Sequence, residues 1–264
     1  MLVGIAPAEH LQALATDRTT TEGRPGRTAM VWSPDGRSIV FSAVQGGRQQ
    51  LYRRAIDQLA ATPIPGTDGA LNPFFSPDGR WIGFWSGGAL RKISADGSGP
   101  ATMICETPAM FGASWGSDDT IVFARNVEGL WRVSAAGGTP QSITRPDRKK
   151  GELKYVLPQV LPGSLAILFT VTHSPLPTWE DTEIVAQSLS TGERTVLVQG
   201  GADGRYIRSG HLLYLRRGTL MAVPFDLERL QVAGGAVAVL ADVMQAGNTP
   251  NEASDSGAGQ FSVS

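Results

Sequence analysis

The chain has 264 residues, a length that fits one large domain or two small ones. Its 32 glycines and 17 prolines exclude a fold made mainly of long helices, because both residues disfavour helix interiors. The net charge of −1 argues against a strongly basic nucleic-acid-binding protein, and no nucleic-acid partner is expected. The single cysteine, Cys105, excludes an intrachain disulfide and a cysteine-cluster metal site.

The amino-terminal segment, residues 1–27, has neither the basic region nor the long apolar core of a signal peptide. Residues 2–6 are apolar and could supply a strand that closes a ring, and residues 9–16 are interpreted as a short helical turn or a loop. No later run reaches the roughly 18 apolar residues of a membrane span, so we expect no membrane contact by this segment.

A repeat organises the rest of the chain. Trp32-Ser-Pro-Asp-Gly-Arg37 recurs as Phe75-Ser-Pro-Asp-Gly-Arg80, a spacing of 43 residues. Degenerate copies follow at 115–119, 160–163 and 209–214. Proline presets the first corner of a turn, aspartate can accept hydrogen bonds from the nearby backbone, and glycine supplies a positive φ. The repeated motif therefore predicts a repeated turn between strands.

Short apolar and aromatic runs surround each of these turns. In the second unit they predict strands at 72–75, 81–85, 89–94 and 101–105. The third unit continues after its turn with runs at 121–123, 130–133 and 141–144, and the fifth has runs at 212–215, 219–224 and 237–240. Each unit is thus interpreted as four short strands.

A period of about 43 residues with four strands per unit is typical of β-propeller blades. We therefore predict an all-β fold, a six-bladed β-propeller of four-stranded antiparallel blades whose last blade is incomplete. The sequence places the blades at about 28–70, 71–110, 111–153, 154–200 and 201–246, with a partial blade at 247–264.

The Ser-Pro-Asp-Gly turns resemble those of the TolB-like propeller repeat, a WD-repeat-like family. Longer phrases, at 42–52, 111–115, 200–206 and 218–226, are similar to the carboxy-terminal propeller of bacterial serine/threonine protein kinases. That resemblance implies an extracytoplasmic, periplasmic-side location and a parent protein with a kinase domain. The chain itself has no Gly-x-Gly-x-x-Gly loop, no His-Arg-Asp and no Asp-Phe-Gly, so kinase activity is carried by none of its residues.

One motif points towards catalysis. Gly112-Ala-Ser-Trp-Gly116 matches the Gly-x-Ser-x-Gly pattern of a nucleophile elbow, which requires a strand before the serine and a helix after it. Ser114 instead falls within the first strand of a blade, and another strand follows. We predict no catalytic residue and no enzyme activity in this chain.

Metal and cofactor sites are not expected either. His10, His173 and His211 lack the close spacing of a histidine metal site. The glycine pairs at 137–138 and 234–235 are interpreted as turns, since no helix follows them to hold a phosphate. The basic run 145–150 is interpreted as a solvated loop between blades.

The most distinctive loop, residues 173–183, carries the weak ligand-binding candidates His173, Trp179, Glu180 and Asp181. An aromatic ring beside acidic groups on a rigid scaffold can form a binding site. In the alternative interpretation Trp179 packs back onto its blade and the acidic groups serve only solubility.

The sequence thus predicts a non-catalytic binding or sensing module for an unidentified protein or small-molecule ligand. By resemblance it belongs to a bacterial receptor-like serine/threonine kinase. Two alternatives remain: the amino-terminal gating propeller of a prolyl-oligopeptidase-type serine peptidase, and a free-standing periplasmic scaffold of the TolB type.

Overall fold

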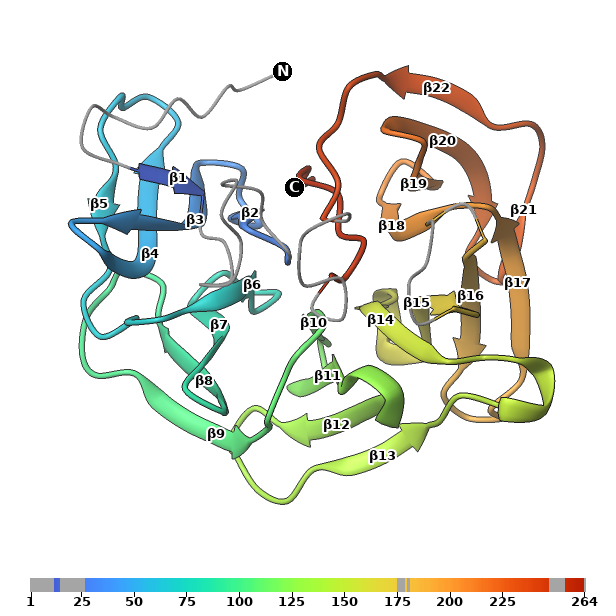
Figure 1. Cartoon of the computed structure of the whole chain (residues 1–264), viewed down its shortest axis with the longest axis horizontal. Coiled ribbons are helices and arrows are strands. Elements are labelled where there is room, and N and C mark those ends of the chain that lie inside the picture. Colours follow the sequence, from blue (N-terminus) through green and yellow to red (C-terminus); the bar gives the residue numbers. More distant parts are fainter. Residues whose placement is uncertain (1–11, 15–26, 175–178, 180, 247–254, 264) are drawn as a thin grey trace.

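The computed structural model describes residues 12–14, 27–174, 179, 181–246 and 255–263. Antiparallel sheets follow one another along this part of the chain and are arranged around a common centre (Figure 1). The fold is an all-β propeller with antiparallel blades, and the described residues form five of them.

The first blade contains β1 (Gln12–Leu14), β2 (Met30–Trp32), β3 (Ser38–Gln45), β4 (Arg48–Ala55) and β5 (Thr62–Pro63). The second contains β6 (Leu71–Phe75), β7 (Trp81–Ser86), β8 (Ala89–Ser94) and β9 (Thr102–Glu106). The third contains β10 (Ala113–Trp115), β11 (Thr120–Ala124), the 3₁₀ turn η1 (Asn126–Glu128), β12 (Leu130–Ser134) and β13 (Gln141–Thr144).

The fourth blade is preceded by η2 (Arg148–Lys150) and contains β14 (Lys154–Val160), η3 (Pro162–Ser164), β15 (Ala166–Thr172), β16 (Glu183–Ser188) and β17 (Arg194–Gln199). The fifth contains β18 (Ala202–Ile207), β19 (His211–Arg216), β20 (Thr219–Asp226), β21 (Gln231–Val232) and β22 (Val237–Leu240). The strands predicted for the second, third and fifth units lie within one or two residues of these bounds, whereas the short β21 was missed.

The Ser-Pro-Asp-Gly turn owes its shape to hydrogen bonds within the motif. The Ser33 hydroxyl donates to the Asp35 carboxylate over 2.6 Å and accepts from the backbone N–H of Ser38 over 2.9 Å. Gly36 has a φ of 67°, a conformation that favours glycine. The stretch 76–81 repeats these contacts in blade 2. The motif therefore folds locally and fixes the register between the first two strands of its blade.

The hydrophobic core lies mainly between successive blades. One apolar cluster joins blades 1 and 2, another joins blades 2 and 3, and further clusters join blades 3 to 4 and 4 to 5. At the second of these joints the rings of Phe74 and Trp115 lie 6.3 Å apart, and Trp81, Trp85 and Trp131 pack against the same cluster. Four tryptophans thus contribute to the packing between blades 2 and 3.

The prediction of six blades is wrong, because the described residues form five sheets. Residues 255–263, assigned to a partial sixth blade, form only an isolated bridge between Gly259 and Gln245. This segment instead lies between blades 5 and 1 (Figure 1). Its Phe261 packs on the blade 5 cluster, while the Gln260 side chain accepts from Ala29 N over 3.1 Å. Residues 247–254 lie outside the described part of the chain.

The expectation for the amino-terminal segment is partly corrected. Residues 2–6, proposed as a closing strand, lie outside the described residues. Within the stretch interpreted as a helical turn or loop, β1 is a strand, and Gln12 pairs antiparallel with Val44 of β3. The first blade therefore recruits a strand from the amino-terminal segment.

None of the helices in the described residues is long and apolar enough to cross a membrane.

Candidate functional site

The first strand of each blade lies nearest the centre of the ring (Figure 1). These inner strands are β2, β6, β10, β14 and β18, and neighbouring inner strands contact one another. A polar or small side chain on an inner strand is therefore close to the neighbouring blades. Together with the carboxy-terminal segment 255–263, the five inner strands enclose a central cavity of about 140 Å³.

A repeated backbone feature shapes this cavity. Asn72, Gly112, Leu157 and Asp203 occupy the same position in blades 2 to 5, and all have a positive φ, between 53° and 104°. In blades 2, 4 and 5 the pairing with the next strand is interrupted at this residue and the one that follows it. Left-handed backbone is costly for leucine, so it persists only where surrounding contacts impose it. The backbone N–H of Leu157 donates to Phe111 O over 2.7 Å, which links blades 3 and 4 at this position.

Asn72 lies in the cavity wall and ties it to the next blade. Its side chain is buried, and its Nδ2 donates to Met110 O over 2.8 Å. Its Oδ1 has no hydrogen-bond partner, and neither has the buried Oγ1 of Thr28, another residue of the cavity wall. Both atoms are closed off from solvent, so they belong to the packed wall of the cavity and are not open to a ligand.

Gln159 ties the cavity wall of blade 4 to blade 5. Its Oε1 accepts from Tyr206 N over 2.6 Å, and its Nε2 donates to Tyr206 O over 3.2 Å. Both ends of the amide are thus used in holding neighbouring inner strands together. Gln159 fixes the shape of the cavity rather than offering a free group to a ligand.

An ion pair borders the same cavity. The Nε of Arg205 lies 2.7 Å from Oδ1 of Asp203, whose Oδ2 accepts from Gly259 N over 2.8 Å. Burial raises the pKa of Asp203, while the Arg205 guanidinium opposes that shift. The pair gives one side of the cavity a positively charged group that is anchored by a buried carboxylate and by the carboxy-terminal segment.

The four candidates of the loop 173–183 do not form one site in the described residues. Trp179 is buried, packs with Ala246 and Ala258, and leaves no room for a side chain at Gly257. The Nε2 of His173 lies 3.5 Å from Oε2 of Glu183. Asp181 is exposed, and Glu180 lies outside the described residues. Trp179 is covered by the carboxy-terminal segment and is not open to a ligand. A ligand role for the loop as a whole stays a prediction.

The residues weighed for catalysis have structural contacts. Ser114 lies in β10, is followed by the strand β11, and its Oγ accepts from Val160 N over 3.0 Å in the next blade. His211 bonds through Nδ1 to Ser209. In the part of the chain that is described, no three His, Cys, Asp or Glu side chains gather as a metal ion would require. His10 lies outside that part.

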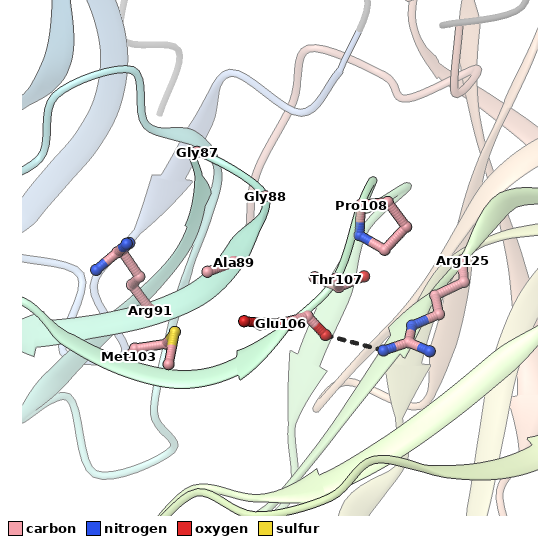
Figure 2. A pocket seen from close by; sticks show the side chains of 9 residues that line it. All are labelled: Gly87, Gly88, Ala89, Arg91, Met103, Glu106, Thr107, Pro108 and Arg125. Carbon is pink, nitrogen blue, oxygen red and sulfur yellow. Dashed lines mark hydrogen bonds between the residues drawn. The ribbon is translucent and has the colours of Figure 1, made fainter.

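A second hollow, of about 570 Å³, lies where blades 2 and 3 meet (Figure 2). Arg91 and Arg125 are its cationic groups. The Nη2 of Arg125 donates to Glu106 O over 2.9 Å, and the guanidinium lies 4.3 Å from the centre of the Trp131 ring. These contacts hold blade 3 to blade 2, so Arg125 already has a structural role. The central cavity, which residues from all five inner strands line, is the stronger candidate.

Sequence reasoning missed Asn72, Gln159, Asp203 and Arg205. Aligning the repeats would have shown that Asn72 and Asp203 share a position with Gly112, and asparagine, aspartate and glycine are the residues that tolerate left-handed backbone. Arg205 reaches the same cavity only because the blades close into a ring. No pattern in the neighbouring sequence indicates this position.

Comparisons with known proteins agree with this architecture. No family model matches the chain. It is 35% identical over 83 residues to the Tol-Pal system protein TolB of Anaeromyxobacter dehalogenans, a match that covers 30% of this chain and 19% of the relative. The crystal structure of TolB from Acinetobacter baumannii matches with a TM-score of 0.59 and 15% identity, over 74% of this chain and 51% of that one.

A prolyl endopeptidase structure matches with a TM-score of 0.54 and 12% identity, over 81% of this chain and 35% of that one. The chain matches only about a fifth of the length of the A. dehalogenans relative. The structural likenesses establish the fold alone: this chain is a β-propeller with a fold similar to that of TolB. They do not transfer an activity.

Proposed function

We propose that this propeller is a non-catalytic binding module that receives a segment of a partner protein at its central cavity. The observation that carries the proposal is the convergence of five inner strands and the carboxy-terminal segment on one cavity, with the Arg205 guanidinium at its border. The cavity holds one or two side chains at most, so the remainder of the partner would lie on the surrounding face.

We propose further that the module is the extracytoplasmic part of a bacterial receptor-like serine/threonine kinase. This finer proposal is supported by the phrases at 42–52, 111–115, 200–206 and 218–226. A gating propeller of a prolyl-oligopeptidase-type peptidase and a TolB-type scaffold share the fold and remain the alternatives. The three proposals differ in what is encoded beside this segment.

Sequencing the DNA on both sides of the reading frame separates them. An upstream kinase domain followed by an apolar span of about 20 residues would support the receptor-like kinase. A downstream hydrolase domain with its own nucleophile elbow would replace that proposal with the peptidase. A signal sequence and a small α/β domain upstream would replace it with the scaffold.

Binding at the cavity is tested with phage-displayed random linear peptides panned on the immobilised protein. Val263 lines the cavity and is 38% exposed, so Val263→Arg would place a charged side chain at the cavity with little cost to folding. Val232 on β21 is 36% exposed and provides the same substitution at a distant site.

We expect enriched peptides to bind Val263→Arg at least about tenfold more weakly than the native protein, and Val232→Arg unchanged. Equal binding to all three proteins would place the peptide site elsewhere. The absence of any enriched peptide would contradict a linear-segment partner.

A further inference from the structure

The outermost strands of the five blades differ in how their free edges are protected. An exposed strand edge offers unpaired N–H and C=O groups to another strand, and proteins usually blunt such edges with proline, charge or short length. β5 has two residues and contains Pro63, β9 ends at Glu106, β13 is flanked by Pro140 and Arg145, and β17 begins at Arg194. Each of these four edges carries at least one protecting feature.

β22 is as short as β13, with four residues, but it has neither the proline nor the charge. The stretch 233–241 contains neither a charged residue nor proline. Val237 is 61% exposed and Val239 is 56% exposed. Among the described residues β20 is the strand that pairs with β22, and β22 lies at the outer rim of blade 5 (Figure 1). Its second edge therefore faces solvent, next to β-branched apolar side chains.

The sequence of β22 is symmetric about Ala238, because valine stands on both sides of it. In an antiparallel pair of two copies centred on Ala238, each Val237 lies opposite Val239 of the partner subunit. β-Branched residues directly opposite each other stabilise antiparallel pairs. The nearest charged residue, Asp242, falls opposite Gly234 of the partner subunit, so no like charges meet. The strand is complementary to itself in sequence and in charge.

We propose that β22 is a dimerisation edge, on which a second copy of this chain pairs antiparallel through Val237–Leu240. The pairing uses the same surface on both copies, so it closes after two subunits. Strand pairing of this length buries less than the roughly 1,200 Å² of a stable interface. The dimer is therefore concentration-dependent. This inference does not rest on the proposed binding function.

The first experiment is sedimentation velocity of the purified chain over a concentration series. We expect a monomer that converts to a dimer as concentration rises. Val239→Lys introduces the charge that the other edges carry and should weaken dimerisation by at least about tenfold. The matched control is Val196→Lys on β17, where the native valine is 48% exposed, and it should dimerise as the native protein does.

The second experiment tests the register. Ala238→Cys places two thiols opposite each other across the two-fold axis, where the Cβ atoms of paired residues lie about 4.5–5.5 Å apart. Mild oxidation should produce a covalent dimer, whereas Val196→Cys should form no covalent dimer. The native Cys105 is buried and does not compete.

Three outcomes would overturn the proposal. The first is a monomer at every concentration, and the second is a dimer that Val239→Lys leaves intact. The third is open-ended aggregation in place of a dimer, which would contradict the two-fold pairing. Thermal unfolding of each variant shows that it is folded before its association is measured.

Discussion

The inner and outer strands of this propeller follow different rules. The inner strands repeat one feature, a left-handed residue at Asn72, Gly112, Leu157 and Asp203, and contact their neighbours through hydrogen bonds between blades. The outer strands vary in length from two residues in β5 to six in β17 and face solvent along one edge. Positions near the centre are thus constrained by two neighbouring blades, whereas positions at the rim are free to vary.

The largest expected contrast is between two ion pairs. Arg205 pairs with the buried Asp203 at the centre, whereas Arg229 lies 3.7 Å from Asp226 at the surface and is 79% exposed. Arg205→Ala leaves a buried carboxylate without its cation and should cost about 3 kcal/mol of unfolding free energy. Arg229→Ala should cost less than about 1 kcal/mol. Urea unfolding at pH 7 measures both.

A second substitution and a change of pH identify why Arg205→Ala lowers the free energy of unfolding. Adding Asp203→Asn to Arg205→Ala removes the buried charge and should restore part of the stability. Burial raises the pKa of Asp203 above its unfolded value, so the folded state binds the proton more tightly. The cost of Arg205→Ala should therefore shrink as pH falls through that raised pKa. A loss that is independent of pH and of Asp203 would show that only packing by Arg205 matters.

The next contrast compares two glycines with positive φ. Gly112 has a φ of 104°, and a Cβ there would lie 2.9 Å from the Cα of Leu157 in the next blade. Gly138, in the turn before β13, has a φ of 130° and no atom within 4 Å of such a Cβ. Gly112→Ala combines backbone strain with a clash and should cost about 2–3 kcal/mol, whereas Gly138→Ala carries the strain alone. Equal losses would mean that the inner strands shift apart easily.

The sequence predicted what is local and repeated. The turn motif and the strand positions follow from the residues of one unit. The hydrogen bonds of Ser33, for example, all lie within residues 33–38. The number of blades was wrong, because spacing alone does not show whether residues 255–263 add a blade or fill the space between blades 5 and 1. The cavity was missed because Asn72 and Arg205 meet there only once the ring has formed.

A smaller effect is expected at the turns between the first and second strands. Hydrogen bonds from Ser76 and from Arg80 lower the pKa of Asp78 to about 2. The folded pKa lies below the unfolded value of about 3.9, so this stabilisation is present above pH 4 and is lost as pH falls towards 2. The side chain is 44% exposed, which limits the contribution to below about 1 kcal/mol.

Asp78→Asn should therefore cost up to about 1 kcal/mol at pH 7, and the difference from the native protein should narrow at about pH 3. Urea midpoints at both pH values measure this. The comparison is Asp118→Asn in the degenerate turn of blade 3, where Gly116 stands in place of the serine and Asp118 accepts from Thr120 N over 3.3 Å and from Ser164 Oγ over 3.1 Å. If the urea midpoints of Asp78→Asn and the native protein differ more at about pH 3 than at pH 7, the ionised carboxylate does not have this role.

The smallest effect is expected on the outer strands themselves. Val196→Thr on β17 keeps a β-branched side chain of the same shape, and its hydroxyl stays in contact with solvent because the position is about half exposed. Its unfolding free energy should stay within about 0.5 kcal/mol of the native value. The same substitution at Val156, a fully buried residue of the inner strand β14, places a hydroxyl without solvent and should cost about 1–3 kcal/mol. If both valines tolerate threonine equally, the rim is as constrained as the centre, and the freedom that lets β22 differ from the other outer strands must have another cause.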